Sequence, residues 1–179
     1  MTTVTSAAAA PSFIDAIRAR AARLRRRIVF PETADVRVRT AVEFLAREGI
    51  VEPIVLLDPE APETHRNVES LGVETIDPRR DPRRARTIAD LLERRASKGL
   101  SEESAAACAS NPLFFADGLV RHGDADGCVA GCVYTTGDVL RAALWLVGTA
   151  PGVQTVSSAF YMVALPFRGD AREVLTFTD

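Results

Sequence analysis

The chain has 179 residues, of which 47% are hydrophobic and 26% are charged, and its formal net charge is −2. This length and composition are typical of a globular protein with one domain, or with one domain and part of another. Positive and negative charges nearly cancel, which argues against nucleic acids and anionic membrane surfaces as partners and favours small molecules. The sequence also contains no uninterrupted run of about 18 apolar residues, the length that a membrane-spanning helix requires.

Helical and extended patterns alternate along most of the chain. Residues 1–11 are small and polar, lack the apolar run of a signal peptide, and predict a disordered leader. Apolar residues spaced three and four apart predict amphipathic helices, and short apolar runs predict buried strands. Caps such as Ser12 and Asn111 mark helix starts. The expected helices lie at 12–24, 38–46, 62–70, 84–97, from 101, from 112 and at 139–147, and the expected strands lie at 28–30, 53–57, 73–76 and 127–131.

The pattern changes after the break at Pro151 and Gly152. Three extended runs follow without a helix between them, at 155–158, 161–165 and 174–178. We therefore expect a leader at 1–11, a first domain at 12–148 and the start of an incomplete second domain at 149–179. A partner chain or further sequence would have to cover the apolar strands of the second domain.

Two arginine runs, at 23–27 and 79–86, are the strongest local concentrations of charge. We expect a solvated helix face and a polar loop, with phosphate recognition as the functional alternative because the guanidinium fork matches a pair of anionic oxygens. Neither run is interleaved with aromatic residues for base stacking, which argues further against nucleic acids.

The segment YTTGD at 134–138 joins a predicted strand to a predicted helix. In open α/β sheets, ligands gather outside the carboxyl ends of strands, where loops lead into helices. The hydroxyls of Thr135 and Thr136, a glycine and several amide N–H groups could together bind an oxyanion or a phosphate.

A purely structural interpretation competes with that one. Thr135 and Asp138 also form a capping box, and Asp138 and Arg141 form an i, i+3 pair on a helix surface. Arg95 is likewise expected as a solvent-facing helical residue paired with Glu93 or Glu102. Spacing alone favours the structural interpretation of these residues.

The three cysteines are an odd number without a secretory leader, which favours reduced thiols in a cytoplasm. Cys128 and Cys132 do not have zinc-site spacing, with or without His122. We therefore expect no metal site and interpret both cysteines as buried small hydrophobic residues.

Several segments resemble the phosphate acetyl- and butyryltransferase (phosphotransacetylase) family. They are RIVFPE at 27–32, DVRV at 35–38, GIVEPI at 49–54, GDADGCVAG at 123–131, DVLR at 138–141, TAPG at 149–152 and VSS at 156–158. The resemblance implies an α/β protein whose amino-terminal portion is a three-layer αβα domain with a mostly parallel sheet, similar to the isocitrate/isopropylmalate dehydrogenase fold. The first strands of a truncated second α/β domain would follow.

The same resemblance implies reversible acetyl transfer between acetyl phosphate and coenzyme A, giving acetyl-CoA and phosphate, in acetate metabolism. Coenzyme A is then a substrate, and neither a metal nor an organic cofactor is implied. The implied quaternary state is a homodimer, or completion by a carboxyl-terminal half, in the cytoplasm. Phosphate butyryltransferase activity and a non-catalytic acyl-phosphate or CoA-binding regulatory module remain alternatives.

By resemblance, Arg141 matches an arginine that binds the phosphate or CoA anion, and Thr135 and Thr136 match the hydroxyl pair that precedes it. Arg95 matches a second substrate-binding arginine. The family's catalytic Ser-Arg pair and aspartate have no counterpart in this chain, so no catalytic residue is assigned here. The chain departs from the usual family residues at Tyr134, Gly137 and Ala142.

Overall fold

The computed structural model describes residues 12–164 and 173–178, so the leader predicted at 1–11 lies outside the described residues. The helices are α1 (Phe13–Leu24), α2 (Val36–Arg47), α3 (His65–Glu69), α4 (Arg84–Arg95), α5 (Glu102–Cys108), α6 (Pro112–Arg121) and α7 (Thr136–Leu146), with the short 3-10 helices η1 (Pro62–Thr64) and η2 (Ala96–Lys98). The strands are β1 (Arg27–Phe30), β2 (Glu52–Leu56), β3 (Glu74–Ile76), β4 (Gly127–Cys128), β5 (Ala159–Ala164) and β6 (Glu173–Thr178). Within the described ranges, no helix is long and apolar enough to cross a membrane.

Four strands form one parallel sheet in the order β3-β2-β1-β4. Val29 of β1 lies beside Ile54 of β2 on one side and beside Cys128 of β4 on the other. The chain moves outward from β1 through β2 and β3 and then returns to pair β4 with the opposite edge of β1. The carboxyl ends of β1 and β4 therefore form the switch point at which open α/β sheets bind ligands.

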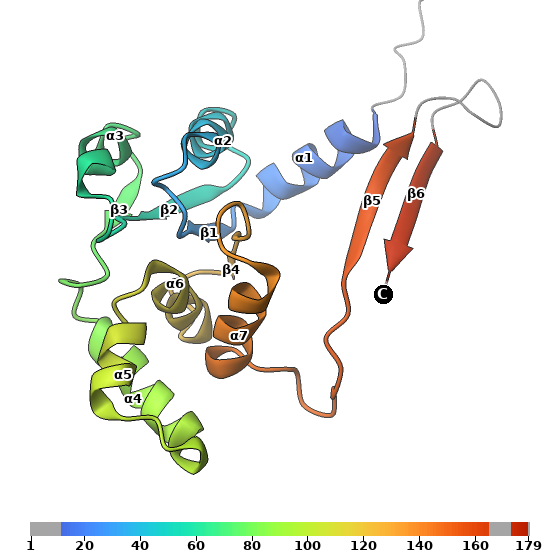
Figure 1. Cartoon of the computed structure of the whole chain (residues 1–179). Helices are drawn as coiled ribbons and strands as arrows, with labels where there is room; N and C mark the ends of the chain where they lie inside the picture. The colour runs from blue at the N-terminus through green and yellow to red at the C-terminus, as the bar shows by residue number, and fades with distance from the viewer. Residues whose placement is uncertain (1–11, 165–172, 179) are drawn as a thin grey trace, which may run out of the picture.

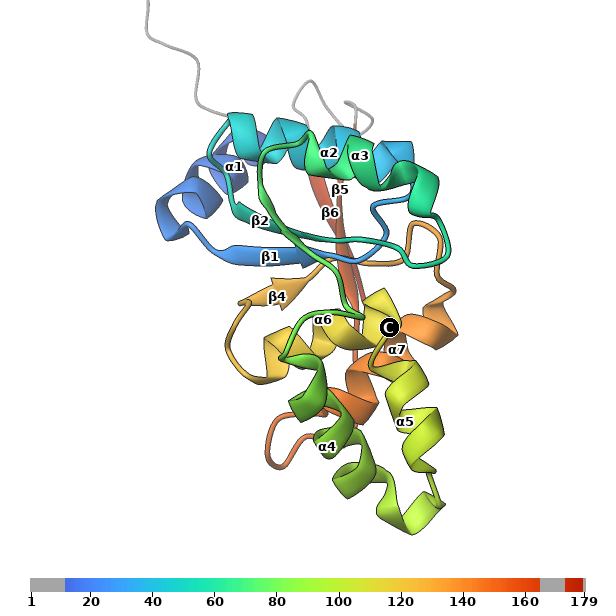
Figure 2. The same ribbon diagram turned by 90° about the vertical axis from the view of Figure 1, so that its left-hand side faces the viewer.

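The two faces of the sheet are covered by different helices, as Figures 1 and 2 show. Side chains alternate along each strand, so Phe30 and Val55 face α2 and α3, whereas Val29 and Ile54 face α6. Buried partners on the first face are Val42 and Val68, and Phe115 is a buried partner on the second. The predicted three-layer αβα domain with a parallel sheet is confirmed.

A second helical cluster extends the α6 side of the molecule. Leu91 of α4, Ala105 of α5 and Leu146 of α7 share one buried apolar contact region. Where α4 meets α6, Gly118 lies directly against the side chain of Thr87, which is only 2% exposed. The two helices approach closely there because Gly118 has no Cβ.

The arginine runs have more structural contacts than a solvated face and a loop would have. Arg26 forms an ion pair with Asp126 at 2.6 Å, immediately before β4. Arg86 forms an ion pair with Asp124 in the same turn. The turn supplies carboxylates to both runs, which the sequence pattern could not show because the partners lie far apart in the chain.

Strand β4 is shorter than the predicted strand at 127–131. After Cys128, the N–H of Val129 still donates to the Val29 carbonyl oxygen at 3.0 Å. The chain then turns away at Gly131, whose φ of 105° lies in the region that favours glycine. The residues that follow form a loop over the carboxyl end of β1.

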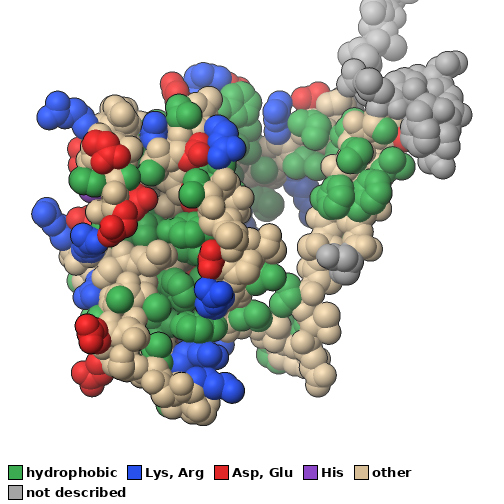
Figure 3. Space-filling model, in the orientation of Figure 1, with side chains coloured by type: hydrophobic (Ala, Val, Ile, Leu, Met, Phe, Trp, Pro, Cys, Tyr) green, Lys and Arg blue, Asp and Glu red, His purple; other side chains and the backbone are tan. Residues whose placement is uncertain are grey.

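Strands β5 and β6 form an antiparallel hairpin that projects beside α1 in Figure 1. The extended run at 155–158 forms no strand, and Leu165 lies outside the described residues. Phe160 and Phe177 stack with ring centroids 4.9 Å apart, yet both side chains are exposed. Figure 3 shows apolar side chains gathered on this hairpin. The domain boundary expected at 148–149 stays a prediction.

Candidate functional site

Helix α7 begins at the switch point, and its first residues carry the predicted anion-binding groups. Thr135 is the N-cap, and its Oγ accepts a hydrogen bond from the Asp138 N–H at 3.2 Å. The Thr135 hydroxyl also donates to Asp138 Oδ2 at 2.7 Å, and Arg141 Nη1 donates to Asp138 Oδ1 at 2.9 Å. The hydrogen bond from Thr135, followed by the charge of Arg141, lowers the pKa of Asp138 below its usual 3.8.

Both contacts that spacing alone favoured are therefore present at this helix start. They do not remove the residues from solvent: Thr135 and Thr136 are exposed, and the Arg141 side chain is 54% exposed. An incoming anion would find the Thr135 hydroxyl and the Arg141 guanidinium already ordered by the cap and by Asp138, and the exposed Thr136 next to them in the chain. Binding of an anion by Thr135, Thr136 and Arg141 stays a prediction.

Arg95 joins the same side of α7 by a contact that spacing did not suggest. Its guanidinium lies over the ring of Trp145, 4.3 Å from the centroid, and not within ion-pair distance of Glu93 or Glu102. Trp145 is one helical turn beyond Arg141, so the two residues lie on the same face of α7. The expectation of a solvent-facing ion pair was wrong for Arg95, because a nearby aromatic ring offers it a cation–π contact.

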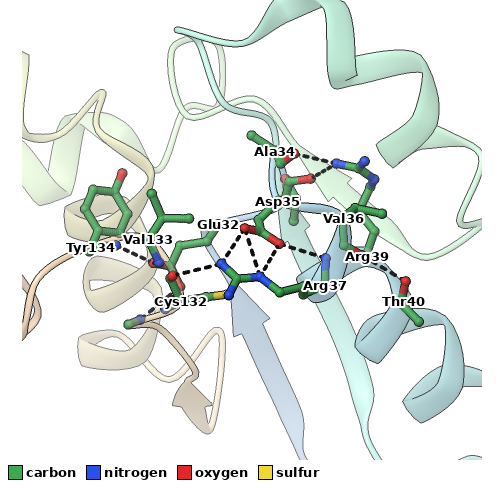
Figure 4. Close-up of polar contacts among 12 residues, drawn as sticks. Glu32, Ala34, Asp35, Val36, Arg37, Arg39, Thr40, Cys132, Val133 and Tyr134 are labelled. Carbon is green, nitrogen blue, oxygen red and sulfur yellow. Dashed lines mark hydrogen bonds and ion pairs between the residues drawn. The ribbon is translucent and has the colours of Figure 1, made fainter.

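A buried glutamate holds the loop that leads into α7. Glu32, at the carboxyl end of β1, is only 5% exposed. Its Oε2 accepts the N–H groups of Gly131 and Cys132, each at 2.9 Å. Its Oε1 accepts the N–H groups of Val133 at 2.6 Å and Tyr134 at 2.7 Å. Figure 4 shows this carboxylate facing the loop.

Glu32 was not among the predicted site residues. Its only signal was a charged residue directly after an apolar strand, within RIVFPE at 27–32. A glutamate is almost never fully buried unless it is paired. That rule identifies a buried glutamate as notable, but the four amide partners lie about one hundred residues further along the chain and could not be read from spacing.

The start of α2 contacts the other side of the same loop. Asp35 caps α2 by accepting the Arg37 N–H at 2.7 Å, and the Arg37 guanidinium pairs with the Asp35 carboxylate. That side-chain hydrogen bond lowers the pKa of Asp35 from 3.8 to about 2. Arg37 Nη2 also donates to the Cys132 carbonyl oxygen at 3.2 Å. The loop is thus held through its N–H groups by Glu32 and through a carbonyl by Arg37 (Figure 4).

The cysteines divide between the core and the surface. Cys128 is half-buried and packs against the sheet core, as expected for a small hydrophobic residue. Cys132 is exposed, which corrects the expectation of burial, because the chain has already turned away from the sheet at Gly131. Among the described residues, no group of three or more His, Cys, Asp or Glu side chains could hold a metal ion.

A pocket of about 610 Å³ opens beside Tyr134. Its lining includes Asn111 at the start of α6 and Arg84 at the start of α4. Arg84 donates to Ser110 Oγ at 2.8 Å, so it is already engaged. Burial raises the pKa of the Tyr134 hydroxyl, which forms a hydrogen bond with Asn111.

Comparison with known proteins gives one consistent family. The family model described as "Phosphate acetyl/butaryl transferase" matches residues 12–179. The phosphate acetyltransferase of Thermoanaerobacterium thermosaccharolyticum is 34% identical over 84% of this chain and 46% of its own length. That of Acetivibrio thermocellus is 35% identical over 85% of this chain and 46% of its own length.

Two solved structures are similar in fold as well as in sequence. EutD phosphotransacetylase from Staphylococcus aureus has a TM-score of 0.69 at 31% identity and is covered over 47% of its length by 88% of this chain. A phosphotransacetylase from Streptococcus pyogenes has a TM-score of 0.73 at 29% identity and is covered over 49% by 90% of this chain. The chain spans about half the length of each of these four proteins.

Proposed function

Because the chain belongs to the phosphate acetyl/butaryl transferase family, we propose that it takes part in reversible acetyl transfer between acetyl phosphate and coenzyme A. In this reaction the CoA thiolate attacks the acetyl carbonyl carbon, a C–S bond forms, and the C–O bond to phosphate breaks as phosphate leaves with the electron pair. Such a reaction requires groups that stabilise the developing oxyanion and the departing phosphate. It requires neither a metal nor an organic cofactor.

The observation that carries the proposal is the set of groups at the start of α7. Thr135, Thr136 and Arg141 lie together and exposed at the carboxyl edge of the parallel sheet, the location at which this class of sheet binds ligands. Arg95, held over Trp145, adds a second guanidinium on the Arg141 face of α7. Together these groups suit the phosphates of acetyl phosphate or of CoA, because guanidinium and hydroxyl groups donate hydrogen bonds to anionic oxygens.

We assign this chain the anion-binding half of the active site. The base that takes the thiol proton would lie in a carboxyl-terminal half that completes the cleft, since the relatives are about twice as long as the matched region. Under this proposal the exposed apolar residues of β5 and β6 contact that half or the second subunit of a homodimer. We place the reaction in the cytoplasm, within acetate metabolism, consistent with three free cysteines.

Calorimetry tests the binding part of the proposal. Titration of coenzyme A into the chain should give measurable binding, and Arg141→Ala should weaken it about tenfold or more, the usual effect of losing a hydrogen bond between charged groups. Arg66→Ala is the matched control, because it removes the same charge from exposed α3 on the opposite face of the sheet. Equal losses in both variants, or no binding by the unmodified chain, would contradict the assignment.

Activity tests the catalytic part. CoA-dependent release of phosphate from acetyl phosphate should be absent or weak with the chain alone and should appear when the corresponding carboxyl-terminal half of a relative is supplied. Binding of CoA without activity in the complemented sample would favour the non-catalytic regulatory module. A higher rate with butyryl phosphate than with acetyl phosphate would identify a butyryltransferase.

A further inference from the structure

The switch point of the sheet is occupied by the protein's own anion. Four consecutive backbone N–H groups, from Gly131 to Tyr134, converge on one carboxylate that is 5% exposed. Consecutive amides that converge in this way form the kind of nest that binds phosphate in other α/β proteins. Here that nest is satisfied internally by Glu32.

We propose that Glu32 is a positioning residue: its carboxylate fixes the loop at 131–134 and thereby sets the start of α7, so that substrate anions are received by Thr135, Thr136 and Arg141 and not by the loop amides. The proposal rests on the proposed function for the identity of those anions. The fixing of the loop stands on the hydrogen bonds alone.

The geometry gives Glu32 little freedom to act otherwise. Each carboxylate oxygen accepts two N–H groups, at distances between 2.6 and 2.9 Å. Its neighbours in sequence, Pro31 and Thr33, are buried, and the Thr33 hydroxyl donates to the Leu56 carbonyl oxygen in β2. The backbone at Glu32 is therefore fixed to the sheet, and the hydrogen bonds of the carboxylate hold the loop in place relative to the sheet.

The contact reaches α7 directly. The amide of Tyr134, the last of the four donors, immediately precedes the N-cap Thr135. Without the carboxylate, four amide N–H groups would lose their acceptor, and each would have to bind water or move; the residues that carry them are exposed, except for the half-buried Tyr134. The chain would then have no fixed direction from which to begin α7, and the hydroxyl and guanidinium groups would lose their common orientation.

The charge of Glu32 also favours binding of substrate anions at the start of α7 over binding at the loop amides. With Glu32 in place, the nest already holds a negative charge, so a second anion entering the same amides would be repelled and would find no donor available. Further donors lie directly after the loop, at the start of α7, where the Arg141 side chain is 54% exposed. The internal carboxylate thus excludes the usual phosphate position and favours the neighbouring one.

Amide hydrogen exchange on the whole chain tests the structural step. In the unmodified protein the amides at 131–134 should exchange slowly, and in Glu32→Ala they should exchange about tenfold faster or more, as expected when hydrogen bonds to a charged acceptor are lost. The amides at 54–56 in β2 serve as an internal reference for global unfolding. Glu43→Ala, which removes an exposed glutamate from α2, is the matched control and should change neither region.

Rescue separates positioning from general damage. The group removed in Glu32→Ala is equivalent to acetate, so sodium acetate should slow exchange at 131–134 again and restore CoA affinity, whereas sodium chloride at the same ionic strength should not. If Glu32→Ala does not fold, Glu32→Gln supplies the same test. Its amide nitrogen would face two N–H donors, so faster exchange is expected at one pair of the four amides.

Calorimetry with coenzyme A tests whether fixing of the loop by Glu32 affects ligand affinity. Glu32→Ala should weaken binding about tenfold, and acetate should reverse the loss. Unchanged exchange at 131–134, or faster exchange with unchanged CoA affinity, would overturn the positioning role. An unmodified chain that binds no CoA would instead overturn the proposed function, while the exchange result would still report whether Glu32 fixes the loop.

Discussion

The parallel-sheet unit (residues 27–146) and the terminal hairpin (β5 with β6) are both rich in apolar side chains but differ in what covers them. In the sheet unit, Val29, Leu91 and Phe115 are completely buried between helices and strands. In the hairpin, Phe160 is 57% exposed and Tyr161 is 59% exposed. The stability of this chain therefore resides in the sheet unit, whereas the hairpin side chains are available for contacts with another surface.

The largest expected effect comes from the core of the sheet unit. Phe115→Ala would remove a fully buried ring from the contact between α6 and the sheet, and it should lower the free energy of unfolding by about 3–5 kcal/mol. Urea denaturation followed by the fluorescence of Trp145, the single tryptophan of the chain, measures this. A loss below about 1 kcal/mol would mean that the sheet unit is not the main source of stability.

A buried carboxyl group on the same helix destabilises the sheet unit when it ionises. Asp117 of α6 is 5% exposed, its Oδ2 has no hydrogen-bond partner among the described residues, and burial raises its pKa from 3.8 to about 7. Below about pH 4 the Asp117 carboxyl is protonated in both the folded and the unfolded state, so it does not lower the free energy of unfolding. Between about pH 4 and 7 only the unfolded state releases it, so stability falls as pH rises and stays low above pH 7.

Asp117→Val should therefore stabilise the chain by about 4 kcal/mol at pH 8 and by much less at pH 4, because each pKa unit corresponds to about 1.4 kcal/mol. Urea denaturation at the two pH values gives the difference. Asp117→Asn is the control, because it removes the ionisation but keeps a buried polar group, so it should flatten the pH dependence with a smaller gain. A pH dependence that is unchanged in Asp117→Asn would contradict the assignment to this carboxyl.

The close approach of α4 and α6 gives a smaller loss. A Cβ at Gly118 would collide with the buried Thr87 side chain, so Gly118→Ala should destabilise by about 1–2 kcal/mol although alanine favours helices. Gly137→Ala in α7 is the matched control, because its Cβ would meet only Thr135 Oγ1 at 3.7 Å. The melting temperature should fall in Gly118→Ala and rise in Gly137→Ala. A rise in both variants would show that α4 and α6 are not tightly packed at Gly118.

Local patterns identified nearly every element of the sheet unit but not the long-range contacts. The stripe of α2, the caps at Asn111 and Thr135 and the buried strand β2 each follow from neighbours within a few residues, so the sequence alone predicts them. The start of β4 was predicted correctly. Its early end was not, because the turn at Gly131 is accompanied by hydrogen bonds to a residue about one hundred positions away.

The candidate site shows the same division. Thr135, Thr136 and Arg141 were predicted to bind anions because they are close in sequence and resemble a family segment, and this role stays a prediction. The stacking of Arg95 on Trp145 and the binding of the loop by Glu32 depend on tertiary structure, for which one sequence carries no spacing signal. Charged residues that the sequence places next to apolar strands therefore merit particular attention in chains of this kind.

A substitution in the hairpin should have the smallest effect on the free energy of unfolding of the sheet unit. Phe160→Ser would lose the stacking with Phe177, worth about 0.5–1.5 kcal/mol to the hairpin itself. A two-stranded hairpin is only marginally stable alone. Its Tyr161 ring contacts the ring of Phe13 in α1, with centroids 5.9 Å apart. The unfolding of the sheet unit, followed through Trp145, should thus change by less than about 0.5 kcal/mol. The same substitution should weaken association with a supplied carboxyl-terminal half, measured by analytical ultracentrifugation. A large loss of sheet-unit stability would show instead that the hairpin is part of its core.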